Sequence, residues 1–304
     1  QDPLRIEHHW QYMYRCFHFR GAAVMGALSA IDIALWDIAG KFYGVPVYQL
    51  LGGKCRDTVR VYSHVSGGSF EELMESCLAE KEKGFTAIGH LSPFLDEPRN
   101  TRYFETYARK ISSGVERIGK IREAVGLDVD LCIENHRRLN PAEAVALAAQ
   151  LEPLLPMFYE DPILPDNFDS MAWVAQKIRI PLATGERIHT PQEYQMLVKR
   201  QALDYLRVSI CVCGGFTGAK KIAAIAEANQ IGIIPHNPLS PVATAACIQF
   251  DAATPSFTIQ EYPDPDGPAA HARFVFEKTG KSAFRASDIV NVMPECRDGF
   301  LVVP

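Results

Sequence analysis

Several features that would mark a nucleic-acid-binding, membrane-bound or exported protein are missing from this sequence. Its 304 residues carry a formal net charge of −5, and they contain no long block of like charges. The lysines and arginines are scattered, so we expect neither nucleic acid nor an anionic membrane as a partner. We find no signal peptide and expect no apolar run long enough to cross a bilayer.

Cysteines in metal-binding patterns are lacking too. Eight cysteines occur, and Cys211 and Cys213 form the closest pair, but no second pair completes a tetrahedral metal site. Others, such as Cys132 and Cys247, fall in apolar or strand-like runs. We therefore expect reduced, buried thiols and a cytoplasmic protein.

The sequence does contain a regular alternation of short apolar runs and long amphipathic stretches. Residues 20–44 predict a helix, because apolar residues recur at helical spacing and Gly40 and Gly44 supply stop signals. From about residue 57, eight strand-like runs follow: VRVYSHV (59–65), TAIGHL (86–91), VDLCIEN (129–135), MFYEDPI (157–163), IPLATGE (180–186), DYLRVSI (204–210), IGIIPH (231–236) and FTIQEY (257–262). Eight strands alternating with helices predict an α/β fold of the (β/α)8, TIM-barrel type.

A doubly wound sheet is the alternative architecture. Such a sheet normally carries a glycine-rich first turn, GxGxxG or GxxxxGK, and neither pattern occurs here. Gly214, Gly215 and Gly218 form a lone cluster that a tight strand-to-helix turn explains.

Three glutamates occupy matching positions at the ends of successive predicted strands. Glu134, Glu160 and Glu186 lie at the predicted ends of the third, fourth and fifth strands, and neighbours are 26 positions apart. One βα unit separates each pair, so we expect the side chains to meet at the carboxyl end of the barrel, where barrel enzymes do their chemistry. A divalent cation relieves their repulsion, and oxygen ligands favour Mg²⁺. The alternative is three separate surface glutamates.

Further candidate residues follow the same strand ends. His136 comes two residues after Glu134, His236 ends the seventh run, and Glu261 lies in the eighth. One histidine is more often structural than catalytic. Two histidines beside a metal cluster are better candidates, since imidazole exchanges protons near neutral pH.

These motifs resemble the mandelate racemase branch of the enolase superfamily. The matching segments are AIDIALWDIAGKFYGVPVYQLLGG, FYEDP, ATGER, CGGFTGAKKIAAIAEA, PHNPLSP and IQEY. The similarity extends from about residue 2 to residue 265 and is closest to sugar-acid dehydratases of the galactonate and mannonate types.

The resemblance implies a role for each candidate. Glu134, Glu160 and Glu186 become Mg²⁺ ligands, although the family usually has aspartate at the first of these positions. His136 resembles the general acid, and His236 resembles the base that removes the proton next to the carboxylate. Glu261, in IQEY, resembles the residue that hydrogen-bonds the substrate carboxylate.

The implied reaction is Mg²⁺-dependent dehydration of an aldonate. The base removes the α-proton, the charge on the carboxylate oxygens is stabilised, and the β-hydroxyl leaves as water. The product is a 2-keto-3-deoxy acid. The expected partner is therefore a small sugar acid, and we expect a homo-oligomer.

Departures from the family pattern leave alternatives open. The second run, AIGHLSPF, has no Lys-x-Lys, which disfavours a racemase or epimerase, and His90 is a further candidate there. Ser209 stands where the family has an aspartate that tunes the base, so a non-catalytic sugar-acid-binding relative stays possible. Tyr103, with Arg99 and Arg102 nearby, is the competing base, although a solvated helix face explains these three residues more simply.

The resemblance also divides the chain. Residues 1–56 are expected to be a mostly helical remnant of a capping domain whose β-rich part is missing, because either the sequence is incomplete or the protein is a truncated relative. Residues 57–262 form the predicted barrel, and residues 263–304 are expected to pack back on the cap.

Overall fold

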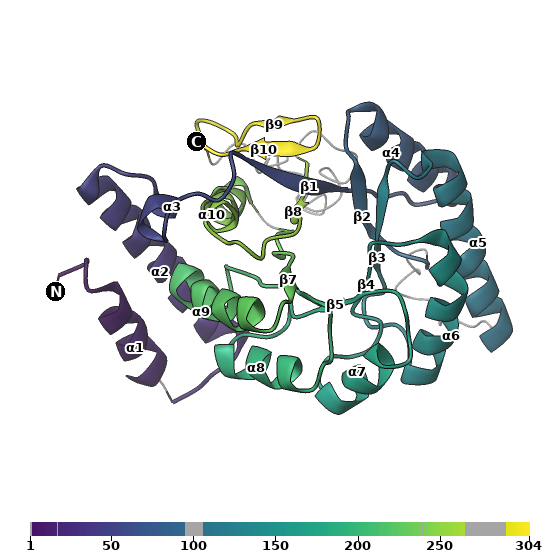
Figure 1. Ribbon diagram of the computed structural model, residues 1–304, viewed down its shortest axis with the longest axis horizontal. Helices are drawn as coiled ribbons and strands as arrows, with labels where there is room; N and C mark the ends of the chain where they lie inside the picture. The colour runs from purple at the N-terminus through teal and green to yellow at the C-terminus, as the bar shows by residue number, and fades with distance from the viewer. Residues whose placement is uncertain (1, 17, 95–105, 239, 265–289) are drawn as a thin grey trace, which may run out of the picture.

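The computed structural model describes residues 2–16, 18–94, 106–238, 240–264 and 290–304. Within these residues, parallel strands form a barrel that helices surround (Figure 1). The barrel strands are β1 (Thr58–His64), β2 (Ala87–Leu91), β3 (Asp130–Glu134), β4 (Phe158–Glu160), β5 (Leu182–Thr184), β6 (Tyr205–Leu206), β7 (Gly232–Ile233) and β8 (Gln260–Tyr262). Strand β1 begins at Thr58, one residue before its predicted run, and each of the other seven strands lies inside its run and is shorter than it.

Neighbouring strands in the chain are also neighbours in the barrel. Parallel pairing runs continuously from β1 to β7, and β8 returns to pair with β1. A bridge between Ile233 and Phe257 joins β7 to the segment before β8, and this bridge closes the circle. The predicted (β/α)8 barrel is confirmed.

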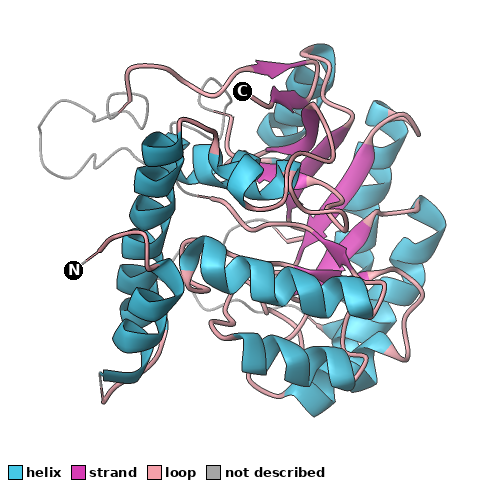
Figure 2. Ribbon diagram, turned by 60° about the vertical axis from the view of Figure 1, so that its left-hand side comes forward, coloured by secondary structure: helices cyan, strands magenta, loops and turns pink. Residues whose placement is uncertain are grey.

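The helices begin at clear sequence signals. Asn140 and Thr190 each form a capping box with a glutamate three residues later, and Ser69 and Ser240 also accept a hydrogen bond from a backbone N–H. The outer helices are α4 (Phe70–Glu82), α5 (Tyr107–Val125), α6 (Pro141–Leu151), α7 (Phe168–Ala175), α8 (Pro191–Lys199), α9 (Gly215–Ala228) and α10 (Pro241–Ala252). Figure 2 shows several of these helices lying over the outside of the strands.

Side chains fill the inside of the barrel. One buried cluster consists of inward-facing residues from the strands or beside them: Tyr62, Ala87, Cys132, Phe158, Ala183, Ile234 and Ile259. A larger apolar cluster includes residues of both the strands and the helices around them. Because the barrel is a packed core and not a pore, a site for a ligand has to lie at one of its ends.

Three helices precede the barrel: α1 (Ile6–Cys16), α2 (Ala22–Tyr43) and α3 (Val47–Leu50). Helix α2 packs against α1 and α9 (Figure 1). By length and composition alone, α2 is apolar enough to cross a membrane, so the expectation that no run reaches this length is wrong. A helix packed in a protein core passes the same test.

The end of the chain returns to the start of the barrel. Strands β9 (Cys296–Arg297) and β10 (Phe300–Val302) pair antiparallel, and β10 pairs antiparallel with β1. The Tyr48 hydroxyl in α3 donates a hydrogen bond of 2.9 Å to the backbone oxygen of Pro304. The division of the chain at residues 56 and 262 stays a prediction.

Candidate active site

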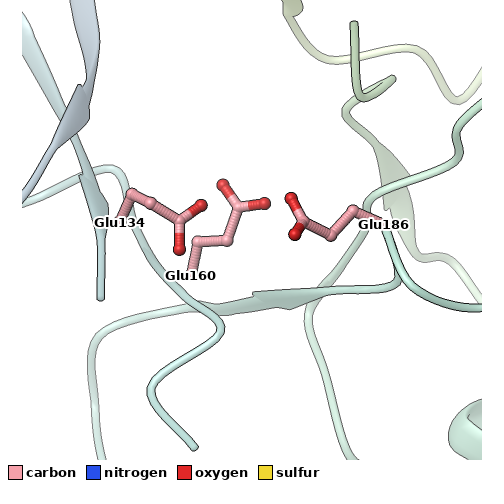
Figure 3. Close-up of side chains that lie close together, drawn as sticks. All are labelled: Glu134, Glu160 and Glu186. Carbon is pink, nitrogen blue, oxygen red and sulfur yellow. The ribbon is translucent and has the colours of Figure 1, made fainter. Parts of the chain in front are cut away.

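The three predicted metal ligands lie together at the carboxyl end of the barrel. Glu134 and Glu160 are the last residues of β3 and β4 and are partners in the strand register, while Glu186 lies just past β5. One ligand oxygen from each side chain lies within 4.8 Å of the others. Figure 3 shows the three carboxylates pointing toward one another.

The charges in this cluster repel one another. Burial, followed by Glu160, Asp161 and Glu186, raises the pKa of Glu134 well above its ordinary value. Burial also raises the pKa of Glu160, although Arg207 acts in the opposite direction. Buried oxygen ligands with an excess of negative charge fit a hard divalent cation, which would hold all three carboxylates ionised.

Arginine side chains offset part of this charge. Arg137 Nη1 lies 2.5 Å from Glu186 Oε1 and 3.0 Å from Asp161 Oδ2. Arg207 pairs with Glu160 and lies 2.7 Å from Glu261 Oε2. None of these pairs involves Glu134, whose Oε1 instead accepts a hydrogen bond of 2.8 Å from the backbone N–H of His136.

His136 stands beside the cluster, on a turn with an unusual backbone. His136 and Arg137 have φ values of 49° and 63°, both in the left-handed region. This turn aims the backbone N–H of His136 at Glu134. It also leaves the imidazole partly exposed, with its ring centroid 4.6 Å from that of His90.

His236 lies on the other side of the cluster, near Glu186. Its Nε2 atom is 3.3 Å from Glu186 Oε2, and its backbone N–H donates to the oxygen of Val208, at 3.0 Å. Ser209, the neighbour of Val208, is buried. A carboxylate of the glutamate cluster, that of Glu186, therefore lies beside His236.

Glu261 is held from several directions. It lies 2.7 Å from His64 Nε2 and 2.7 Å from Arg207 Nη2, and the backbone N–H of Asn237 donates to its Oε2 at 2.8 Å. Burial opposes ionisation, but Arg207, followed by His236 and His64, lowers the pKa of Glu261 well below its ordinary value. Glu261 is therefore a buried, charged carboxylate that orients Arg207 and His64.

The sequence interpretation missed Arg207 and His64, which are both 1% exposed. A signal for Arg207 was present, because an arginine inside the run DYLRVSI has to be paired when that strand is buried. His64 ends an ordinary strand pattern and gave no comparable signal. The competing base, Tyr103, and its neighbours Arg99 and Arg102 lie outside the described residues.

Comparisons with known families agree with this geometry. Residues 75–304 match the model described as enolase C-terminal domain-like, and residues 1–52 match the N-terminal domain of mandelate racemase and muconate lactonizing enzyme. The chain belongs to the mandelate racemase branch of the enolase superfamily. It is 37% identical over 262 residues to a D-galactonate dehydratase of Verminephrobacter eiseniae, an alignment that covers 86% of this chain and 67% of that protein.

Other members of the branch show the same similarity. A D-galactonate dehydratase family member of Streptomyces bingchenggensis is 36% identical over 284 residues, with 86% of this chain and 69% of that protein covered. A mandelate racemase/muconate lactonizing enzyme-like protein of Rubrobacter xylanophilus has a TM-score of 0.88 at 32% identity. The match covers 100% of this chain and 79% of that protein. An enolase of Agrobacterium radiobacter, solved with sodium and L-malate, has a TM-score of 0.86 at 32% identity. The match covers 100% of this chain and 76% of that protein.

Proposed function

We propose that this chain is a Mg²⁺-dependent dehydratase of a sugar acid, an aldonate, which it converts to a 2-keto-3-deoxy acid. One observation carries the proposal: three strand-end carboxylates converge within 4.8 Å, at the end of the barrel that also holds His136 and His236. The dehydratase names of the relatives support the same reaction class.

Glu134, Glu160 and Glu186 are the residues that would hold the Mg²⁺. When bound there, the ion supplies positive charge for the carboxylate oxygens of the substrate as the α-proton is lost. Arg137 and Arg207 orient two of the three ligands, because each pairs with one of them.

The two histidines then have complementary roles. His236 removes the proton next to the carboxylate, and the electrons of that C–H bond form the carbon–carbon double bond of an enol. His136 protonates the β-hydroxyl, so that the C–O bond breaks and water leaves. The enol tautomerises to the 2-keto acid. Glu261 hydrogen-bonds the substrate carboxylate in this proposal, and it also pairs with Arg207.

The test is a screen of acid sugars that includes D-galactonate and D-mannonate, with a colour assay for the keto acid. Dehydration predicts keto-acid formation that needs added Mg²⁺ and is lost in Glu160→Gln. Interconversion of epimers without keto acid would instead indicate an epimerase. Binding without any reaction would indicate a non-catalytic relative. Cytoplasmic location and homo-oligomeric assembly remain predictions.

A further inference from the structure

A row of three imidazoles runs along one side of this end of the barrel. His64 ends β1, His90 lies near the end of β2, and His136 follows β3. The ring centroids of His64 and His90 are 5.0 Å apart, and those of His90 and His136 are 4.6 Å apart. His64 is buried against Glu261, whereas His90 and His136 are partly exposed, so a ligand meets the row at these two.

The backbone of β2 is distorted where His90 enters the row. Ile88 pairs with Leu131 and Leu91 pairs with Ile133, so β2 carries one more residue than β3 between these two pairs. His90 itself has a φ of 57°, in the left-handed region that few residues other than glycine adopt. Bulges and left-handed residues of this kind gather where a strand re-aims a side chain beside a site.

Gly89, the residue before His90, brings the backbone of β2 close to the barrel interior. A Cβ atom on Gly89 would lie 2.1 Å from Cδ2 of Tyr62, whose ring belongs to the barrel interior. The backbone at Gly89 therefore lies directly against that ring. With the extra residue next to Gly89, the ring of His90 lies close to the rings of both His64 and His136.

We propose that His90 binds the hydroxyl groups of a polyhydroxylated acid and determines which acid the site accepts. A neutral imidazole has one N–H donor and one nitrogen acceptor, so it pairs with a hydroxyl in either direction. The carboxylates on the other side of the site suit a cation and the acid group bound to it. The inference rests on the proposed function for its choice of ligand, but it does not require turnover.

The experiment measures binding, with Mg²⁺ present, of D-galactonate, D-mannonate and glycolate by calorimetry. Glycolate has the carboxylate and the α-hydroxyl but no polyol chain. His90→Asn keeps a residue that tolerates the left-handed backbone but is shorter, and His90→Phe keeps a ring without hydrogen-bonding atoms. Both variants should weaken the better-bound sugar acid by about three- to tenfold and leave glycolate unchanged.

The exposed His8 in α1 provides the matched control, since His8→Asn should change neither affinity. Unchanged sugar-acid affinity in both variants overturns the inference. An equal loss for glycolate also overturns it, because His90 would then support the whole cation site. The inference is also overturned if the wild-type protein binds neither sugar acid.

Thermal unfolding of each variant shows whether it folds, and His90→Asn decides the question if His90→Phe does not. If the proposed function fails but the inference about His90 holds, the result differs from the outcomes above. In that case a sugar acid binds with the expected dependence on His90, yet no keto acid forms.

Discussion

Arg207 Nη2 lies 2.7 Å from Glu261 Oε2, and the same guanidinium also pairs with Glu160. A buried cation thereby connects the end of β8 to one of the three carboxylates of the metal cluster. Glu261 in turn contacts His64, which begins the imidazole row. Arg207 and Glu261 therefore connect the metal cluster to the imidazole row. A substitution at either residue should disturb both the cluster and the row.

Arg207→Met should strongly destabilise the protein. The substitution leaves Glu160 and Glu261 buried without their cation, and breaking a buried pair in this way costs about 3–5 kcal/mol. Urea unfolding at pH 7 measures the change. Arg200→Met is the control: Arg200 pairs with the exposed Asp169, and its loss should cost about 0–1 kcal/mol. Similar small losses for both variants would show that Arg207 does not hold the site together.

Glu134→Gln should remove the response to Mg²⁺ without weakening the protein in the absence of metal. Burial, followed by Glu160, raises the pKa of Glu134, so a neutral side chain there relieves repulsion in the metal-free state. Thermal unfolding with a chelator should give a midpoint at or above that of the wild type. Added Mg²⁺ should raise the midpoint of the wild type only, by mass action.

Glu152→Gln serves as the control for Glu134→Gln, because Glu152 lies away from the cluster, beside Arg179. It should respond to Mg²⁺ as the wild type does. A Glu134→Gln protein that still gains stability from Mg²⁺ would place the ion elsewhere.

The fold could be predicted from the sequence because the pattern of apolar residues is periodic. The run 129–135 contains β3, and the equal spacing of the glutamates placed Glu134 and Glu160 in register. The roles of Arg207 and His64 were not predicted, because each pairs with a residue far away in the chain. No spacing rule connects residues that meet across a barrel. The orientation of His90 depends on a bulge, which a two-residue strand period cannot anticipate.

His136→Asn should slow turnover while the fold and Mg²⁺ binding survive. A positioned acid or base contributes about 10²–10⁴-fold, so kcat should fall by that factor on the acid that the keto-acid screen identifies. Asparagine tolerates the left-handed backbone that His136 adopts, and the backbone N–H that donates to Glu134 is retained. Steady-state kinetics measure the effect, with His8→Asn as the control. Near-normal kcat would remove His136 from the mechanism.

Asp32 should make the protein less stable as the pH rises from 4 to 7. Burial is the main cause that raises the pKa of Asp32 from 3.8 to about 6, although Thr217 in α9 donates two hydrogen bonds to its carboxylate. Between these two values the folded state binds more protons than the unfolded state. The free energy of unfolding therefore falls with rising pH, by roughly 3 kcal/mol for this group, and the loss is complete above the folded pKa.

Asp32→Asn isolates that contribution. The amide has one acceptor and one donor for Thr217 and does not titrate in this range. Urea midpoints measured at pH 4, 5, 6 and 7 should fall less steeply for the variant than for the wild type. Parallel curves would show that Asp32 does not titrate there.

His236 should be the base, and loss of its imidazole should stop exchange of the substrate α-proton with solvent. His236 lies beside Glu186, which can orient the ring although Ser209 replaces the usual aspartate. Exchange is followed in deuterium oxide by proton magnetic resonance, with the sugar acid that the screen identifies. In His236→Asn the rate should fall about 10²–10⁴-fold.

The same measurement separates His236 from its competitor and from the general acid. His136→Asn should still exchange the α-proton, because proton removal comes before the hydroxyl leaves, although its keto-acid formation is slow. Tyr103→Phe should exchange at the wild-type rate if that tyrosine is not the base. If His236→Asn keeps the wild-type exchange rate while Tyr103→Phe loses exchange, Tyr103 is the base, and His236 then serves only to hold the substrate near Glu186.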